Sequence, residues 1–209
     1  DSISVRARQN SYRDEFGLGD RTVVMYAGNV GFSQSLDLLV DSARRMADRA
    51  DVVFVVNGGG SAMEELAGSA ADLPNVVLVP LQPRERLPEV LAAADIHTVL
   101  LKAGLAKASV PSKTYSVLAA GRPVVASVDT GTEVTRMLAA SGGGVSAAPD
   151  DREGFFDALR GLIDDPDRRR EMGRSGREWV MESASPAGVA AAYEALFEQL
   201  TAGRAGGQA

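Results

Sequence analysis

Six short, continuously apolar segments dominate this sequence and limit the folds that it can adopt. They are residues 22–27, 52–57, 76–80, 96–101, 123–127 and 143–147. Apolar runs of this length are typical of strands that are buried on both faces of a parallel sheet. Between them, apolar residues recur at helical spacing, as at Leu36, Leu39, Val40 and Ala43. This alternation predicts an α/β fold, a Rossmann-like, doubly wound parallel sheet of six strands.

The domain organisation follows from what lies after the sixth segment. There the sequence predicts only helices, over residues 151–164, 166–182 and 186–200. A chain of 209 residues is enough for one packed domain, and no internal repeat or long linker divides it. We therefore expect one domain over residues 1–201 and a flexible tail over 202–209. The chain begins at Asp1 and has its first methionine at Met25, which indicates a segment of a longer protein.

Composition excludes several classes of function. The net charge of -6 argues against binding to nucleic acid. The absence of cysteine excludes disulfides and thiol catalysis and suits a cytoplasmic protein. No apolar run reaches the roughly 18 residues that a membrane span needs. The only histidine, His97, lies inside a predicted strand without neighbouring metal ligands, so we expect it to be buried and hydrogen-bonded and expect no metal site.

A candidate anion site lies just before the fifth predicted strand. Ser112 is suited to cap a short helix through its hydroxyl, and Gly121 is suited to end it in a left-handed conformation. The helix would begin with Ser112, Lys113 and Thr114 at the carboxyl edge of the sheet, where free N–H groups and a lysine can hold a phosphate. The alternative is a capped helix with a solvated lysine. We favour the phosphate site because a lysine in the first turn opposes the helix dipole.

Three segments carry a family resemblance. They are PSKTYSVLAAGRPVVAS at residues 111–127, YAGNVG at 26–31 and NGGG at 57–60. Together they resemble the C-terminal, donor-binding domain of the family 4 (group 1) glycosyltransferases, which have the GT-B fold. The resemblance runs from about Val23 to Leu200 and includes the MG..GR.WV stretch at 172–180.

The resemblance implies a function and a set of partners. Such a domain binds a nucleotide-diphosphate sugar, with UDP as the commonest nucleotide, and no further cofactor. The sugar would pass, with retention, to an acceptor held by an N-terminal domain, in synthesis of cell-surface polysaccharide or glycoconjugate. This chain alone would then bind the donor without transferring it, and peripheral membrane association through the other domain stays open.

The resemblance also assigns binding residues. The first glycine loop, against the diphosphate, corresponds to Gly28, Asn29 and Gly31. The second, near the nucleoside, corresponds to Gly58 and Gly59, and the base-holding loop corresponds to Leu81 and Gln82. Ser112, Lys113 and Thr114 correspond to the phosphate-binding helix start.

The sequence departs from the family at three places. The family commonly carries two glutamates eight positions apart, where this chain has Ala108 and Ser116. Ser116 can keep one weaker contact to the ribose. A basic pair of the first glycine loop is also absent, so charge compensation for a diphosphate falls to Lys107 and Lys113. No catalytic residue is assigned.

Alternative functions stay open at this point. One is a nucleotide-sugar 2-epimerase-like enzyme, and another is a degenerate, non-catalytic nucleotide-binding module, which the missing glutamates favour. An NAD-binding domain is disfavoured because no G-x-G-x-x-G follows the first strand. Glu133 could bind a ribose, but the run from Thr130 to Glu133 reads as a helix capping box, which we favour.

Overall fold

The predicted parallel sheet is confirmed by a computed structural model of the chain, which describes residues 3–105, 111–149 and 151–205. Every strand pairing is parallel, and the order is β3-β2-β1-β4-β5-β6. The strands are β1 (Thr22–Asn29), β2 (Val52–Gly59), β3 (Val76–Pro80), β4 (Ile96–Leu100), β5 (Val124–Ser127) and β6 (Gly144–Ala147). Their limits differ from the predicted ones by at most two residues, because β1, β2, β4 and β5 are largely buried on both faces and all six runs are mostly apolar.

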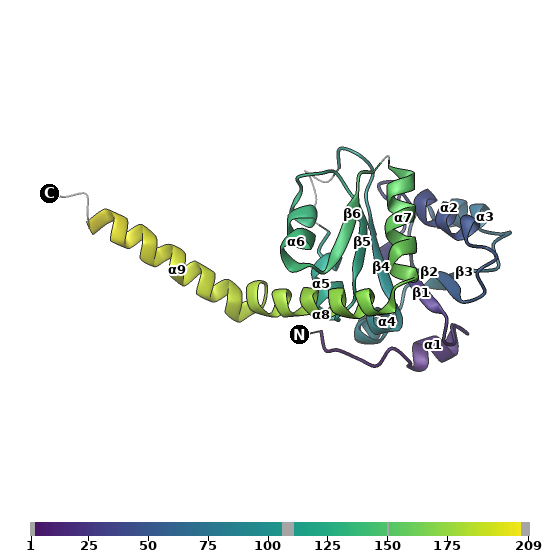
Figure 1. Ribbon diagram of the computed structural model, residues 1–209, viewed down its shortest axis with the longest axis horizontal. Coiled ribbons are helices and arrows are strands. Elements are labelled where there is room, and N and C mark those ends of the chain that lie inside the picture. The colour runs from purple at the N-terminus through teal and green to yellow at the C-terminus, as the bar shows by residue number, and fades with distance from the viewer. Residues whose placement is uncertain (1–2, 106–110, 150, 206–209) are drawn as a thin grey trace.

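Helices cover both faces of this sheet (Figure 1). They are α1 (Ser11–Glu15), α2 (Asp37–Arg45), α3 (Met63–Ser69), α4 (Leu87–Ala93), α5 (Lys113–Ala119), α6 (Glu133–Ser141), α7 (Arg152–Ile163), α8 (Pro166–Ser183) and α9 (Pro186–Ala205), with a 3-10 turn at Arg84–Arg86. Side chains of α2, α3 and α7 pack on one face of the central strands, and those of α1 and α4 pack on the other. Helix α5 joins a second cluster with β5 and α6.

The three C-terminal helices begin and end close to the predicted positions, with one exception. Helix α9 continues to Ala205, past Ala202, where the sequence predicts the start of a tail. Alanines at 202 and 205 are strong helix formers, so the helix extends beyond the last large apolar residue. This helix points away from the rest of the domain (Figure 1).

The two ends of α5 differ in how well the sequence predicts them. Gly121 has a φ of 71°, and the N–H groups of Gly121 and Arg122 donate to the carbonyls of Leu118 and Val117, which confirms the predicted glycine stop. The predicted Ser112 cap is wrong. Ser112 has helical dihedral angles (φ -56°, ψ -24°), and its hydroxyl accepts no N–H of the first turn. A serine caps a helix only from an extended conformation, which places its oxygen over the free N–H groups.

The predicted capping box at Thr130 to Glu133 is also wrong. Helix α6 begins at Glu133 itself, so this residue occupies the first helical position rather than the third. The Thr132 hydroxyl donates to the Asp129 carbonyl at 2.9 Å, and Glu133 pairs with Arg136 at 3.0 Å. Glu133 is therefore a surface residue in an exposed helical ion pair.

The glycines of the MG..GR.WV stretch have a packing role. A Cβ atom on Gly173 would overlap the Gly121 carbonyl oxygen, and one on Gly176 would crowd Leu118 and Gly143. Helix α8 therefore crosses the end of α5 at backbone contact.

We expect Gly173→Ala to destabilise the fold by about 1–3 kcal/mol, because neither backbone can move away without opening the core. Gly68→Ala is the matched control, since Gly68 also lies in a helix but has no heavy atom within 4 Å of an added Cβ. The control should be stabilised, by up to about 1 kcal/mol. Urea unfolding of the two variants measures both effects, and an equal response of the two would contradict this role of Gly173.

Candidate donor-binding site

The carboxyl ends of β1 and β2, the loop after β3 and the start of α5 enclose a cavity of about 480 Å³. In open α/β sheets, ligands bind at this edge, near the point where the strand order reverses. Here the reversal lies at β1 and β4, which are adjacent in the sheet although two other strands lie between them in sequence. The cavity brings together six of the residues predicted to bind a ligand: Gly28, Leu81, Gln82, Ser112, Lys113 and Ser116.

Lys113 provides the positive charge of this cavity. Its Nζ lies 3.7 Å from the centroid of the Tyr26 ring and 3.5 Å from the carbonyl oxygen of Ala27. An ammonium over an aromatic face is attracted by the ring quadrupole, which fixes where the amine sits. Burial lowers the pKa of Lys113 to about 7. Among the described residues, no carboxylate forms an ion pair with this amine, so an anion in the cavity would supply the missing counter-charge.

The first glycine loop brings its backbone close to this amine. Gly28 has a φ of 139°, a region that residues with a side chain rarely adopt, and a Cβ there would lie 3.7 Å from Lys113 Nζ. Tyr26 helps to hold the same loop in place, since its hydroxyl donates a hydrogen bond to the Asn29 carbonyl at 2.6 Å. Lysine, aromatic ring and glycine backbone thus form one unit at the end of β1.

A second, smaller cavity of about 300 Å³ lies on the other side of Lys113. Asn29 and Gln34 line it together with Tyr26 and Ser112. The lysine therefore lines two cavities at this edge, one mostly apolar and one bounded by the glycine loop.

The remaining predicted residues lie elsewhere. Gly58 lines neither cavity; a Cβ there would overlap the Gly28 carbonyl oxygen, so this glycine permits close packing of β2 on β1. Gly59 also lines neither of the two cavities. Gly31 lines a different one, between α2 and α3. Thr114 is fully buried and lines neither cavity. Lys107 lies outside the described residues.

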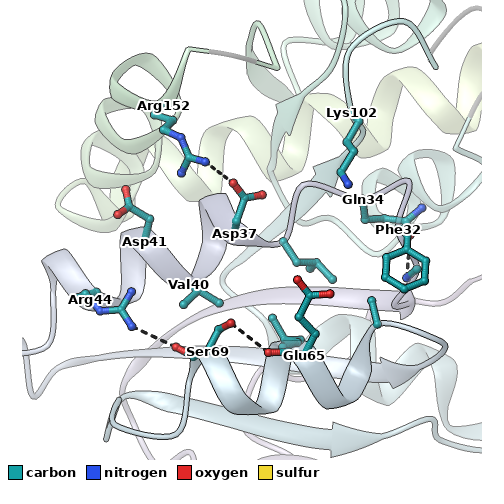
Figure 2. A pocket seen from close by; sticks show the side chains of 14 residues that line it. Phe32, Gln34, Asp37, Val40, Asp41, Arg44, Glu65, Ser69, Lys102 and Arg152 are labelled. Carbon is teal, nitrogen blue, oxygen red and sulfur yellow. Dashed lines mark hydrogen bonds and ion pairs between the residues drawn. The ribbon is translucent and has the colours of Figure 1, made fainter.

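Another hollow, of about 490 Å³, lies between α2 and α3 (Figure 2). Its rim carries charges of both signs: Asp37 pairs with Arg152, and Arg44 donates to the Ser69 carbonyl at 3.0 Å. Lys102 lies over the loop that carries Gln34 (Figure 2). Because acidic and basic groups alternate around it, this groove suits a dianion less than the cavity beside Lys113 does.

Sequence reasoning missed three residues of the site. Tyr26 lies in an apolar run, where nothing marks it as the support of a lysine 87 positions later. Asn57 is 4% exposed, lines the cavity and accepts a hydrogen bond from the Tyr12 hydroxyl at 2.8 Å. His97 is buried and hydrogen-bonded as predicted, but it also lines the cavity. The polarity of Asn57 and His97 inside apolar strands was the available clue.

The described residues lack two further features. They contain no cluster of three or more histidine, aspartate or glutamate side chains arranged to hold a metal ion. They also contain no helix with the length and apolar character needed to cross a bilayer.

The sheet order and the cavity at its carboxyl edge define a Rossmann-like domain of the kind that forms half of a GT-B enzyme. The sequence model of the family described as "Glycosyl transferases group 1" matches residues 21–165. The chain therefore belongs to the group 1 glycosyltransferases.

Individual relatives agree with this assignment. The chain is 32% identical over 130 residues to the putative colanic acid biosynthesis glycosyl transferase WcaI of Escherichia coli, covering 61% of this chain and 32% of that protein. It is 30% identical over 178 residues to a GDP-mannose-dependent phosphatidylinositol monomannoside mannosyltransferase of Mycolicibacterium smegmatis, covering 82% and 46%. The fold matches that of Anabaena HepE, crystallised with UDP-glucose, with a TM-score of 0.71 at 16% identity over 91% of this chain and 51% of that one. The chain thus spans less than half the length of the two curated relatives.

Proposed function

We propose that this chain is the nucleotide-sugar-binding part of a retaining glycosyltransferase. The observation that carries the proposal is the Lys113 amine, held over Tyr26 beside the Gly28 backbone and facing an apolar cavity without a counter-ion among the described residues. A nucleoside diphosphate matches both parts of this site, the apolar cavity and the amine beside the glycine loop. Its base and ribose fit the cavity lined by Leu81 and its neighbours, and its diphosphate fits the lysine and the glycine loop.

The proposed chemistry is electrostatic stabilisation of a leaving group. When the bond between sugar and diphosphate breaks, negative charge grows on the departing phosphate oxygen. A fixed ammonium at that position stabilises the transition state more than the ground state, and in a water-poor cavity this effect is large. In this proposal Lys113 supplies the charge, and no metal ion or other cofactor is required.

We further propose that the donor is a UDP-sugar, in keeping with the UDP-glucose bound by HepE. The acceptor would be held by a second domain and would belong to a cell-surface polysaccharide or glycoconjugate; the name of WcaI, which refers to colanic acid biosynthesis, supports a role of this kind. In this proposal the reaction takes place in the cytoplasm, and the chain alone binds the donor without transferring the sugar.

A second candidate is a nucleotide-binding module without catalysis. Ser116 lines the cavity at the position where the family resemblance places a carboxylate. A serine makes a weaker contact to a ribose than a carboxylate does, since charged hydrogen bonds are roughly twice as strong as neutral ones. Binding is expected in both cases, so the absence of transfer by a complete enzyme would favour this second candidate.

The test is a comparison of nucleotides and of two cavity-filling variants. We expect UDP to raise the melting temperature, and UMP to bind at least about tenfold more weakly because it lacks the second phosphate. Ser116→Phe should abolish the UDP-induced shift by filling the proposed site. Ser69→Phe, which fills the groove between α2 and α3, should leave it intact.

Two results would overturn the proposal. One is the absence of a shift with UDP, GDP, ADP and dTDP alike at millimolar concentration. The other is loss of the shift in Ser69→Phe but not in Ser116→Phe, which would place the nucleotide in the other groove.

A further inference from the structure

The floor of the proposed donor cavity contains a buried histidine. His97 belongs to β4, is 1% exposed, and lines the cavity of about 480 Å³. Its Nε2 lies 3.0 Å from the carbonyl oxygen of Leu91, in α4. A carbonyl oxygen only accepts hydrogen bonds, so Nε2 must carry a hydrogen and donate it.

The second ring nitrogen of His97 is therefore an acceptor. Burial, together with the charges of Arg122 and Lys113, lowers the pKa of His97 to about 4, although the Leu91 hydrogen bond acts in the opposite direction. The ring is thus neutral at physiological pH and has a single N–H. Because Nε2 holds that hydrogen, Nδ1 presents a lone pair.

No group among the described residues uses this lone pair. Within the described part of the chain, the Leu91 carbonyl is the one hydrogen-bond partner of the His97 ring. The surrounding cavity wall is largely apolar and includes Val90 and Val117. An acceptor that faces a largely apolar wall without a protein partner is unfavourable, and a leucine or phenylalanine would fill the same strand position without that cost. A purely structural role explains the Nε2 bond but leaves Nδ1 unexplained.

We infer that His97 Nδ1 accepts a hydrogen bond from the nucleoside part of the donor and makes His97 a specificity-determining residue. This inference rests on the proposed function. The chemistry required of the ligand is a donor group within the nucleoside, either an N–H of the base or an O–H of the ribose. Lys113, whose charge acts on His97, would hold the diphosphate of the same molecule.

The test combines protein variants with modified ligands. In calorimetric titrations with UDP, His97→Leu should bind about five- to tenfold more weakly than the wild type, the effect of one neutral hydrogen bond. His97→Gln, which keeps one donor and one acceptor, should recover part of this loss. On the ligand side, 2′-deoxy-UDP tests the ribose hydroxyl, and N3-methyl-UDP tests the base N–H. The analogue that lacks the relevant donor should bind the wild type more weakly but should bind His97→Leu as well as UDP does.

A matched control separates lost stability from lost recognition. Asn75 is 5% exposed, donates from Nδ2 to the Ala43 carbonyl at 2.8 Å, and directly precedes β3, at the opposite edge of the sheet from the cavity. Asn75→Leu should lower the melting temperature without changing the affinity for UDP. Equal UDP affinity of wild type and His97→Leu would overturn the inference and leave the proposed function standing. If His97→Leu does not fold, wild-type affinities that are equal for UDP and both analogues overturn it. Absence of binding of UDP, GDP, ADP and dTDP alike by the wild type would instead overturn the proposed function.

Discussion

A Lys113→Met protein is expected to bind UDP about 30-fold more weakly than the wild type and yet to be more stable without ligand at neutral pH. The affinity falls because the amine that faces the diphosphate is lost. The stability rises because the folded protein no longer holds a half-buried ammonium without a carboxylate partner among its described residues. Methionine is the replacement of choice, since its thioether can keep the contact with the Tyr26 ring.

The gain in stability should depend on pH in a defined direction. The pKa of Lys113 falls from 10.5 in the unfolded chain to about 7 in the folded one, so between these values the folded state binds fewer protons. Stability of the wild type is therefore lost as the pH falls from 10.5 to 7, and the loss is complete below 7. One pKa unit corresponds to about 1.4 kcal/mol; for this half-buried amine we expect Lys113→Met to gain about 1–2 kcal/mol at pH 7 and nothing above pH 10.5.

The affinity of the wild type should show the complementary pH dependence. Above pH 7 most of the free amine is neutral, and the diphosphate must bind together with a proton. The UDP affinity should then fall by up to about tenfold per pH unit above pH 7, whereas that of Lys113→Met stays flat. Urea unfolding and calorimetry between pH 6.5 and 9 measure both effects.

Lys102→Met is the matched control. Lys102 is exposed and lines the groove between α2 and α3, so its loss should leave both stability and UDP affinity nearly unchanged. If Lys113→Met and Lys102→Met behaved alike, the amine over Tyr26 would not be the site of the diphosphate.

The fold could be predicted from the sequence because strand burial leaves a local trace. Each strand of this sheet is mostly apolar, and the helices between them repeat apolar residues at helical spacing. The ends of helices were harder to predict. Gly121 was predictable because only glycine readily adopts its positive φ, whereas the roles of Ser112 and Glu133 depend on where the first helical turn begins, which shifts by one or two residues without a change in pattern.

The residues of the site likewise divide into those that could be predicted from the sequence and those that could not. Lys113 and Gly28 were predictable because they follow strands and carry the residue types that bind phosphate. The contact of Tyr26 with Lys113 and the positions of Asn57 and His97 in the cavity floor could not be predicted, because they depend on the register of the strands. Asn57 pairs with Ala27 on one side of β1, and His97 pairs with Met25 on the other, so residues 40 positions apart meet in one cavity.

The segment before β1 shows most clearly what local sequence patterns cannot predict. It supplies Arg13, one partner of a buried ion pair. Arg13 is 1% exposed, and its Nη2 lies 2.7 Å from Oδ2 of Asp95, the residue before β4. Asp95 also accepts hydrogen bonds from Arg8 at 2.6 Å and from the Val23 N–H at 2.8 Å. Burial alone would raise the pKa of Asp95, but the bonds from Arg8 and Val23 and the two guanidinium charges outweigh it and hold the pKa below its usual value.

Loss of Asp95 is therefore expected to have the largest effect on stability of any single change considered. Asp95→Leu should cost about 3–5 kcal/mol, because it leaves the buried Arg13 without a counter-charge. Adding Arg13→Met should recover part of the loss, and only part, since Arg13 also donates to the Ala93 carbonyl at 2.8 Å. Breaking the exposed pair of Asp167 and Arg170 by Asp167→Leu should cost at most about 1 kcal/mol.

Two further measurements test the role of Asp95, the pH dependence of stability and the affinity for UDP. A carboxyl group with a lowered pKa contributes stability above its unfolded pKa, and this contribution is lost as the pH falls through the folded value. The wild type should thus lose its advantage over Asp95→Leu in acid. Because Asp95 lies at the amino end of β4, at the opposite edge of the sheet from Lys113, the folded variant should keep its affinity for UDP. A loss of affinity equal to that of Lys113→Met, or a stability change no larger than that of Asp167→Leu, would refute the assignment of Asp95 to the stability of the fold alone.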